Sequence, residues 1–333
     1  MNDFSDEPEY DVVGLGNAIV DVLAHADDGF LADHSLTKGA MTLIDADQAE
    51  QLYRLVSDTV ECSGGSAANT MVGLVSLGSR AAYIGKVRDD DLGAVFSRDI
   101  RAAGVAFETP FATDGPATAQ CLVLVSPDAQ RTMQTFLGAS AALSPADVDA
   151  RVIRSSKVTY LEGYLWDPPP AKEAFLKAAK VAHDAGRMVA LSLSDPFCVD
   201  RHRTEFLDLV DHHVDILFAN EDEVVSLFEA EGFDTAVAQL QGRCRWAALT
   251  RGAAGAVVLC GDTRVDVPAE PVKDVLDTTG AGDLFAAGFL HGLTRGLDPA
   301  TCGRLGAIAA AEAISHFGAR PVRDLQQLTK AVR

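Results

Sequence analysis

The chain has 333 residues, of which 48% are hydrophobic and 23% charged, and its formal net charge is -20 at pH 7. This composition is that of a folded protein with a full hydrophobic core, in one large domain or two. So acidic a chain is a poor partner for nucleic acid or an anionic membrane, and its apolar runs are too short to predict a membrane-spanning helix. Any polyphosphate must therefore be held locally, by helix N-termini, a few basic side chains and a metal ion.

The N-terminal residues and the cysteines indicate the cellular compartment in which the protein is expected. Residues 1–9 are polar and acidic, and they lack the basic and apolar parts of a signal peptide. The cysteines form no C-x-x-C pair, and the adjacent His212 and His213 would point apart. We therefore expect neither a zinc site nor a disulfide framework, and a reducing cytoplasm as the compartment. The six cysteines are Cys62, Cys121, Cys198, Cys244, Cys260 and Cys302.

Residues 10–14 are predicted to form a buried strand, and Asn17 and Asp21 follow it in an otherwise apolar stretch. Gly14 and Gly16 resemble the start of a dinucleotide-binding fingerprint, but the third glycine and the following helix pattern are missing. Ligands bind at the carboxyl ends of strands in open α/β sheets, and an Asn with an Asp suits a vicinal diol. An Asx turn followed by a surface Asp explains the two residues equally well.

Residues 29–44 are interpreted as strands of a subsidiary sheet, and residues 46–60 as an amphipathic helix. A glycine-rich turn at Gly64 and Gly65 then leads into another helix, with Asn69 one turn further on. The two glycines allow the backbone to approach a ligand closely. Tight packing of the helix on a sheet is the other explanation for the small residues.

Residues 119–125 and 131–136 are β-rich and are joined by a turn at 126–130, which predicts a hairpin. Together with the strands expected within 29–44, this hairpin would form a small sheet apart from the main fold. Arg131 begins the second strand of the hairpin. By itself it would be an ordinary solvated charge.

Beyond residue 137 strands and helices alternate regularly. The strand at 216–219 ends in the acidic sequence Asn220-Glu221-Asp222-Glu223. Such oxygen ligands suit a hydrated magnesium ion, although acidic residues at a helix start are also ordinary caps. Further strands are expected at 158–163, 188–194 and 246–252, a hairpin at 256–267, and helices at 170–185, 284–294 and 299–315.

The segment Asp277-Thr278-Thr279-Gly280-Ala281-Gly282-Asp283 is a glycine-bracketed turn that opens an apolar helix. The first N–H groups of such a helix can bind an anion, because they lack partners and lie at the positive end of the helix dipole. A carboxylate beside a bound phosphate is unfavourable unless it takes a proton from an incoming hydroxyl, which is the role of a catalytic Asp in phosphoryl transfer. An ordinary helix start remains the alternative.

Three motifs in this order resemble those of the ribokinase-like (PfkB) carbohydrate kinase family. They are Gly64-Gly65-Ser66-Ala67-Ala68-Asn69, the N-x-x-E pattern from Asn220 to Glu223, and the segment 277–283. The resemblance implies an α/β fold, a Rossmann-type three-layer sandwich with a small β-sheet lid. On this basis we expect residues 1–18, 46–107 and 138–333 to form the large domain, and residues 19–45 and 108–137 to form the lid.

The resemblance also implies a role for each matching residue. Asp283 would be the catalytic base, and the lid residue Arg131 would reach the phosphates. ATP with Mg²⁺ would be required, and a K⁺ site of many members falls at Asp274. The remaining roles are an anion hole at Gly280, Ala281 and Gly282, substrate contacts at Asn17, Asp21, Gly64, Gly65, Asn69 and Tyr164, nucleotide contacts at Asn220, Thr250, Gly252 and Thr279, and magnesium held through water by Asn220 and Glu223.

The spacing Asn17-x-x-x-Asp21 resembles that of the adenosine kinases within the family, which place an aromatic ring near the position of Tyr164. We therefore expect phosphorylation of adenosine at its 5′-hydroxyl to give AMP, a reaction of purine salvage. Inosine, guanosine, ribose and fructose are the alternative substrates. A non-catalytic relative that binds a nucleoside or sugar is a further hypothesis, although such a protein would have no need of Asp283. A monomer and a homodimer fit the sequence equally well.

Overall fold

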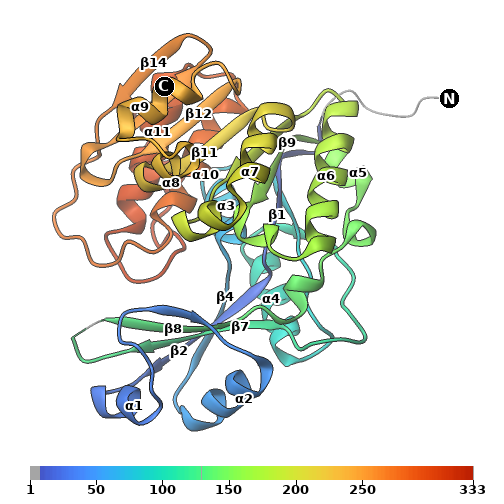
Figure 1. The fold of residues 1–333 in the computed structure, drawn as a ribbon, viewed down its shortest axis with the longest axis vertical. Coiled ribbons are helices and arrows are strands. Elements are labelled where there is room, and N and C mark those ends of the chain that lie inside the picture. The colour runs from blue at the N-terminus through green and yellow to red at the C-terminus, as the bar shows by residue number, and fades with distance from the viewer. Residues whose placement is uncertain (1–7, 129, 333) are drawn as a thin grey trace.

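The computed structural model describes residues 8–128 and 130–332, and two sheets organise them (Figure 1). The expectation that the N-terminus carries no signal peptide concerns residues that lie mostly outside this range. The larger sheet has nine strands in the order β14-β13-β12-β11-β10-β9-β1-β5-β6. Its strands are β1 (Tyr10–Leu15), β5 (Ala81–Ile84), β6 (Ala106–Phe107), β9 (Ser156–Glu162), β10 (Met188–Ser192), β11 (Ile216–Asn220), β12 (Trp246–Thr250), β13 (Ala256–Cys260) and β14 (Thr263–Val267).

The strands from β12 to β6 are parallel, and β13 and β14 extend the sheet as an antiparallel hairpin. A parallel sheet must be covered on both faces, which is why its strands are continuous apolar runs. In β1, for example, Val12 and Val13 point to opposite faces and are both fully buried. One core forms around Tyr83 and Phe289, and a second forms around Phe175 and Phe206 on the other face.

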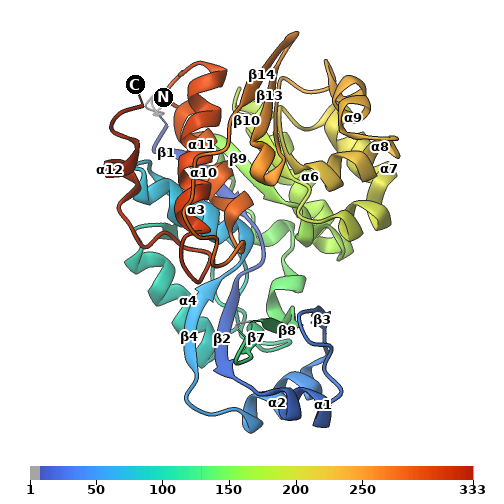
Figure 2. The same cartoon turned by 90° about the vertical axis from the view of Figure 1, so that its left-hand side faces the viewer.

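Helices cover the two faces of the large sheet, as Figure 2 shows, and this confirms the predicted three-layer α/β fold. In the described part of the chain no helix is long and apolar enough to cross a membrane. One face carries α3 (Ser66–Ser76), α4 (Asp91–Ala102), α10 (Ala281–Leu293), α11 (Pro299–Ala313) and α12 (Leu325–Thr329), and the other carries α5 (Ala150–Arg154), α6 (Pro169–Asp184), α7 (Pro196–His212), α8 (Glu221–Phe228) and α9 (Phe233–Leu240).

The smaller sheet lies apart from the large domain, at the bottom of Figure 1. It has five strands in the order β3-β8-β7-β2-β4. The predicted hairpin is present with its predicted bounds. β2 pairs in parallel with β7, a strand about a hundred residues later in the chain. The strands are β2 (Ile19–His25), β3 (Met41–Leu43), β4 (Val60–Gly64), β7 (Ala119–Val125) and β8 (Arg131–Phe136).

Two predictions for the N-terminal part of the chain are corrected. Residues 29–44 contain a helix, α1 (Asp28–Asp33), and only one short strand, because the Asp27 side chain caps that helix by accepting from the Phe30 N–H. In addition, residues 46–107 do not all belong to the large domain. Strand β4 pairs with β2 in the small sheet, and α2 (Ala46–Leu55) packs on β7 and β8.

The fold brings the starts of α3 and α10 together. Both helices follow a glycine-rich turn, and they pack closely on the same face of the large sheet. Gly73 allows this approach, since a Cβ there would lie 2.8 Å from atoms of Ala287 and Leu284. Ser66 and Asn69 in the first turn of α3 can therefore reach Asp283 in the first turn of α10.

Candidate active site

A cavity of about 790 Å³ lies between the carboxyl ends of the large-sheet strands and one face of the small sheet. This is where ligands bind in open α/β sheets. The small sheet contributes apolar side chains, including Met41 and Leu43. Thirteen residues that the sequence analysis selected line the cavity: Asn17, Asp21, Gly65, Asn69, Tyr164, Asn220, Glu223, Thr250, Thr279, Gly280, Ala281, Gly282 and Asp283.

Four selected residues do not line this cavity. Gly64 lies directly beneath Asp21, and Arg131 lies at the edge of the site. Gly252 begins a short 3₁₀ helix after β12 and is exposed. Asp274 is exposed in the loop between β14 and α10.

The start of α10 is open toward the cavity. Gly280, immediately before the helix, has φ +79°, and a Cβ there would lie 2.6 Å from the Cα and O of Ala319, so the turn requires glycine. Among the described residues no side chain caps the helix. The N–H of Ala281 is partly used by the carbonyl of Thr278 at 3.2 Å. An uncapped helix N-terminus of this kind favours an anion.

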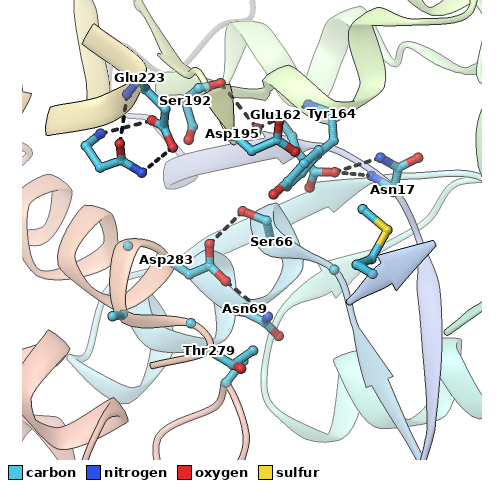
Figure 3. Close-up of a pocket in the computed structure, with 18 of the residues that line it drawn as sticks. Asn17, Ser66, Asn69, Glu162, Tyr164, Ser192, Asp195, Glu223, Thr279 and Asp283 are labelled. Carbon is cyan, nitrogen blue, oxygen red and sulfur yellow. Dashed lines mark hydrogen bonds between the residues drawn. The ribbon is translucent and has the colours of Figure 1, made fainter. Parts of the chain in front are cut away.

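Asp283 is held by two side chains of α3 (Figure 3). Its Oδ1 accepts a hydrogen bond from Ser66 Oγ at 2.6 Å, and its Oδ2 accepts one from Asn69 Nδ2 at 3.2 Å. Burial raises the pKa of Asp283 to about 6, although these two hydrogen bonds oppose the shift. The carboxylate is therefore mostly ionised at neutral pH, yet basic enough to take a proton. Ser66 belongs to one of the three sequence motifs, but no role for it was predicted from the sequence.

Glu162 is the second residue that the sequence analysis missed. It ends β9, and it is 1% exposed. Its Oε1 accepts from the backbone N and from Nδ2 of Asn17, at 3.2 and 2.8 Å, and its Oε2 accepts from Ala67 N at 2.8 Å. Burial raises the pKa of Glu162 to about 7. Glu162 thereby ties the end of β1 to the start of α3.

Asn17 is engaged on both sides of its amide. Its Nδ2 donates to Glu162, and its Oδ1 accepts from Ser140 Oγ at 2.9 Å. Its backbone carbonyl lies against Gly65, where a Cβ would come within 2.3 Å and where φ is +96°. Asn17 therefore shapes the floor of the cavity through contacts within the protein.

Asp21, by contrast, presents an open carboxylate. It lies on β2 of the small sheet and lines the cavity. Its carboxylate lies over Gly64, where a Cβ would fall 2.4 Å from Oδ2. Burial raises the pKa of Asp21 to about 6, while the positive charges of Arg320 and Arg131 lower it. In residues 8–128 and 130–332 no donor is hydrogen-bonded to these oxygens, so they can accept hydrogen bonds from a ligand.

Asn220 and Glu223 form a reciprocal cap at the start of α8. The Glu223 carboxylate accepts from Asn220 N at 2.9 Å and from Nδ2 at 2.7 Å, and Glu223 N donates to Asn220 Oδ1 at 2.9 Å. Burial raises the pKa of Glu223 to about 7. Within the described ranges no group of three or more His, Cys, Asp or Glu could hold a metal ion. Both residues line the cavity, where they could contact a hydrated ion through water.

Arg131 connects the small sheet to the turn before α10. Its Nη2 lies 2.7 Å from Asp277 Oδ2, and its Nη1 lies 3.5 Å from Thr279 Oγ1. The guanidinium also lies over the Phe317 ring at 5.6 Å. The pKa of Asp277 is lowered despite its burial, because the N–H of Gly318 and both donors of Thr279 bond to it and Arg131 is near.

The site thus combines an ionised but basic carboxylate, an anion-binding helix start beside it, a free carboxylate on the opposite wall, and apolar side chains from the small sheet. A hydroxyl beside Asp283 could lose its proton while a phosphoryl group occupied the start of α10. This is the arrangement that phosphoryl transfer to an alcohol needs.

Comparison with known proteins agrees with this chemistry. A family model described as pfkB family carbohydrate kinase matches residues 36–325. The adenosine kinase of Sinorhizobium meliloti is 50% identical, with a TM-score of 0.90 over 98% of this chain and 100% of that chain. A probable sugar kinase of Rhizobium etli CFN 42 is 48% identical, with a TM-score of 0.90 over 97% of this chain and 98% of that chain.

A curated relative gives a similar result. The adenosine kinase of Saccharomyces cerevisiae is 26% identical over 329 residues, which cover 92% of this chain and 95% of the relative. The family predicted from the three sequence motifs is therefore confirmed. The chain belongs to the pfkB family of carbohydrate kinases, phosphotransferases that have a hydroxyl group as acceptor.

Proposed function

We propose that this protein transfers the γ-phosphoryl group of ATP to the 5′-hydroxyl of a nucleoside, with adenosine as the substrate and AMP as the product. The observation that carries the proposal is the position of Asp283. Its carboxylate is bonded to Ser66 and Asn69, has no cationic partner among the described residues, and lies in the first turn of an uncapped helix. A carboxylate without a counter-ion beside an anion site suits a base better than a structural ion pair.

In the reaction, Asp283 accepts the proton of the substrate hydroxyl as the new O–P bond forms. The N–H groups of Gly280, Ala281 and Gly282 stabilise the charge on the transferring phosphoryl group. Movement of the small sheet toward the large domain would exclude water, which strengthens these interactions and suppresses hydrolysis of ATP.

Asp21 supports a nucleoside or sugar acceptor. Its open carboxylate can accept hydrogen bonds from both hydroxyls of a ribose diol, which would leave the 5′-hydroxyl free to point toward Asp283. The exposed side chains of Met41 (48%) and Leu43 (55%) suit the apolar faces of a base, as does the ring of Tyr164. The likeness to the Sinorhizobium meliloti adenosine kinase over nearly the whole chain supports adenosine as that nucleoside.

The phosphate donor would lie on the other side of Asp283. Thr250 and Thr279 line the cavity there, and Arg131 is within reach once its ion pair with Asp277 opens. Magnesium bound with ATP would supply positive charge to the phosphates, and Asn220 and Glu223 would hold it through water. Potassium binding near Asp274 and activity in the cytoplasm stay predictions, as does the choice between a monomer and a homodimer.

A free sugar is the second candidate substrate. The probable sugar kinase of Rhizobium etli resembles this chain nearly as much as the adenosine kinase does, at 48% identity and the same TM-score. A hexose or pentose would use Asp21 and Asp283 in the same way. It would leave the apolar wall at Met41 and Leu43 without a partner, which favours the nucleoside.

A coupled assay of ADP release decides between these substrates. Adenosine, inosine, guanosine, ribose and fructose are each supplied with MgATP, in the presence and absence of K⁺. The proposal predicts the highest kcat/KM with adenosine. Preference for a sugar would replace it with the second candidate, and ADP release with none of the five would favour a ligand-binding relative without kinase activity.

A further inference from the structure

The loop after α11, residues 314–324, packs against the active site although none of the three sequence motifs includes it. The buried side chain of Glu312 fixes its shape: Oε1 accepts from the backbone N–H groups of Val322 and Arg323 at 3.1 and 2.8 Å. His316 Nε2 lies 3.2 Å from the other oxygen of Glu312. The loop is thus held on α11 independently of any ligand.

This loop also braces the anion-binding turn. The N–H of Gly318 donates to Asp277 Oδ2 at 2.9 Å. Ala319 lies so close to Gly280 that no side chain fits between them. The next residue, Arg320, extends behind the cavity toward α3. Three consecutive residues therefore contact the turn before α10 and the helix that carries Ser66 and Asn69.

Within the described residues the side chain of Arg320 makes one hydrogen bond, from Nε to Asn69 Oδ1 at 3.3 Å. Because a guanidinium has only donors, it can bond only to the oxygen of that amide. The nitrogen of Asn69 must then face the other way, where it donates to Asp283 at 3.2 Å. Arg320 therefore favours the same orientation of the Asn69 amide as the ionised Asp283 carboxylate, which can only accept a hydrogen bond.

A second observation concerns the rest of the guanidinium. Its Nη2 is buried and has no hydrogen-bond partner in the described part of the chain. Burying a donor without a partner costs free energy, and burying an unpaired charge costs more, so such a group in a folded protein calls for an explanation. The ionisable groups around it come from four elements: Asp21 on β2, Cys62 on β4, Tyr83 on β5 and Asp99 on α4.

Asp21 is the member of this group that lines the cavity. Arg320 is the largest of the influences that lower the pKa of Asp21, ahead of Arg131 on the small sheet, while burial raises it. In the described ranges no direct ion pair joins the two residues, so the positive charge of Arg320 acts on Asp21 without a contact between them. An ionised Asp21 accepts hydrogen bonds from two hydroxyls, whereas a protonated one loses part of that capacity.

We propose that Arg320 is a positioning residue for the acceptor substrate: it orients the Asn69 amide toward Asp283 and supplies the positive charge against which Asp21 binds the substrate diol. The proposal rests on the proposed function for the identity of the diol. It assigns a role in the reaction to the loop 314–324. Arg320 itself touches neither the cavity nor the reacting atoms and acts through Asn69 and Asp21.

The test compares Arg320→Met, which keeps the length of the side chain without its charge, with Arg320→Lys, which keeps the charge. Arg323→Met is the matched control, since Arg323 is exposed on the same loop. We expect Arg320→Met to raise the KM for adenosine about 10-fold at pH 7.5, with a smaller effect on kcat, because the hydrogen bonds between the substrate diol and the charged Asp21 carboxylate are weakened. The increase in KM should be larger at pH 6.5, because without Arg320 the pKa of Asp21 rises and more of the carboxylate is protonated. Arg320→Lys should restore most of the KM and its pH dependence.

Two further measurements separate this role from loss of folding. In an Asp21→Asn background Arg320→Met should raise the Kd for adenosine, measured by calorimetry, by a smaller factor than in wild type, because the charge on Asp21 is gone and only the effect through Asn69 remains. The effect should also shrink with 2′,3′-dideoxyadenosine, which lacks the diol. Additive effects of the two substitutions would overturn the proposal, as would an unchanged KM and pH profile, or a lower melting temperature that Arg320→Lys does not restore.

The substrate panel of the wild-type protein separates an error in the proposed substrate from an error in the role of Arg320. The wild-type substrate panel is measured first. If a sugar is the preferred acceptor, the same variants are compared with that sugar. If none of the compounds supports ADP release, calorimetric binding of each compound to wild type and Arg320→Met replaces the KM. In either case the ratio of the KM or Kd of the variant to that of wild type decides the role of Arg320.

Discussion

Replacing Ser66 with alanine should change the pH dependence of the reaction more than its maximal rate. The hydroxyl of Ser66 donates to Asp283 Oδ1 at 2.6 Å and favours the ionised form of the carboxylate. Removing this donor leaves Asn69 as the remaining hydrogen-bond donor to the carboxylate among the described residues. The pKa of Asp283 should therefore rise further above its ordinary value, since burial is no longer opposed as strongly.

The size of the shift follows from the difference between two hydrogen bonds. A bond to a charged group contributes about 1.5–3 kcal/mol and one to a neutral group about 0.5–1.5 kcal/mol, so the ionised form loses about 1–1.5 kcal/mol relative to the acid. At about 1.4 kcal/mol per pKa unit this is a rise of about one unit. Starting from a pKa of about 6, the ionised fraction at pH 6 falls from about one half to about one tenth, a loss of about 5-fold.

The direction in which the activity profile shifts follows from the role of Asp283 as a base. A base works when ionised, so a raised pKa moves the acid limb of the activity profile to higher pH and leaves the alkaline plateau in place. The assay is kcat/KM from ADP release between pH 5.5 and 9. Ser63→Ala is the control, because the hydroxyl of Ser63 is buried and has no partner among the described residues. A Ser66→Ala profile that superimposes on wild type, or one lowered equally at every pH, would show that Ser66 does not set the pKa of the catalytic base.

Three other substitutions test the remaining parts of the site. Asp283→Asn keeps the shape of the side chain but removes the base, and should lower turnover by at least about 10²-fold while calorimetric binding of ATP persists; wild-type turnover would show that another group is the base. Gly280→Ala places a Cβ 2.6 Å from Ala319 in a residue at φ +79°, so the melting temperature and kcat should fall together. Gly282→Ala is the control and should keep the melting temperature, because its Cβ would meet nothing within 4 Å among the described residues. Glu223→Gln should raise the Mg²⁺ concentration needed for half-maximal ADP release without changing the KM for adenosine, and an unchanged Mg²⁺ requirement would contradict a role in holding the ion.

Local patterns were enough to predict the scaffold. The hairpin of β7 and β8 has β-rich segments on both sides of a turn that contains Pro127 and Asp128, and these signals act over a few residues only. The helix-opening turns at Gly65 and Gly280 are equally local, because positive φ values restrict them to glycine. For this reason the sequence alone places the segments around Asp283 and Asn69 at helix starts.

Longer-range features could not be predicted in this way. Glu162 looks like an ordinary strand residue, and its role depends on the N–H groups of Asn17 and Ala67, which meet only in the folded sheet. Arg320 belongs to no motif, and its contact with Asn69 spans 251 positions of the chain. The membership of β4 in the small sheet was missed for a related reason, since its short sequence shows no alternation and its partner strand is distant.

The parallel pairing of β2 with β7 has a consequence for how the protein folds. Ile19 lies opposite Ala119 and His25 opposite Val125, so every pair is 100 positions apart (119 − 19 and 125 − 25). Closing a loop of that length costs about 4 kcal/mol of chain entropy, and such distant pairings form slowly. The chain between these strands includes α3, β5 and α4 of the large domain.

We therefore expect the large domain to assemble first and the small sheet to close last. An intermediate of this kind would already have Ser66 and Asn69 next to Asp283, while Asp21 would still lie on an unpaired strand. A substrate that binds Asp21 stabilises the pairing that the chain makes last. In this order of folding, the residues proposed for phosphoryl transfer would come together early, and a ligand could help to complete the part of the site that contains Asp21.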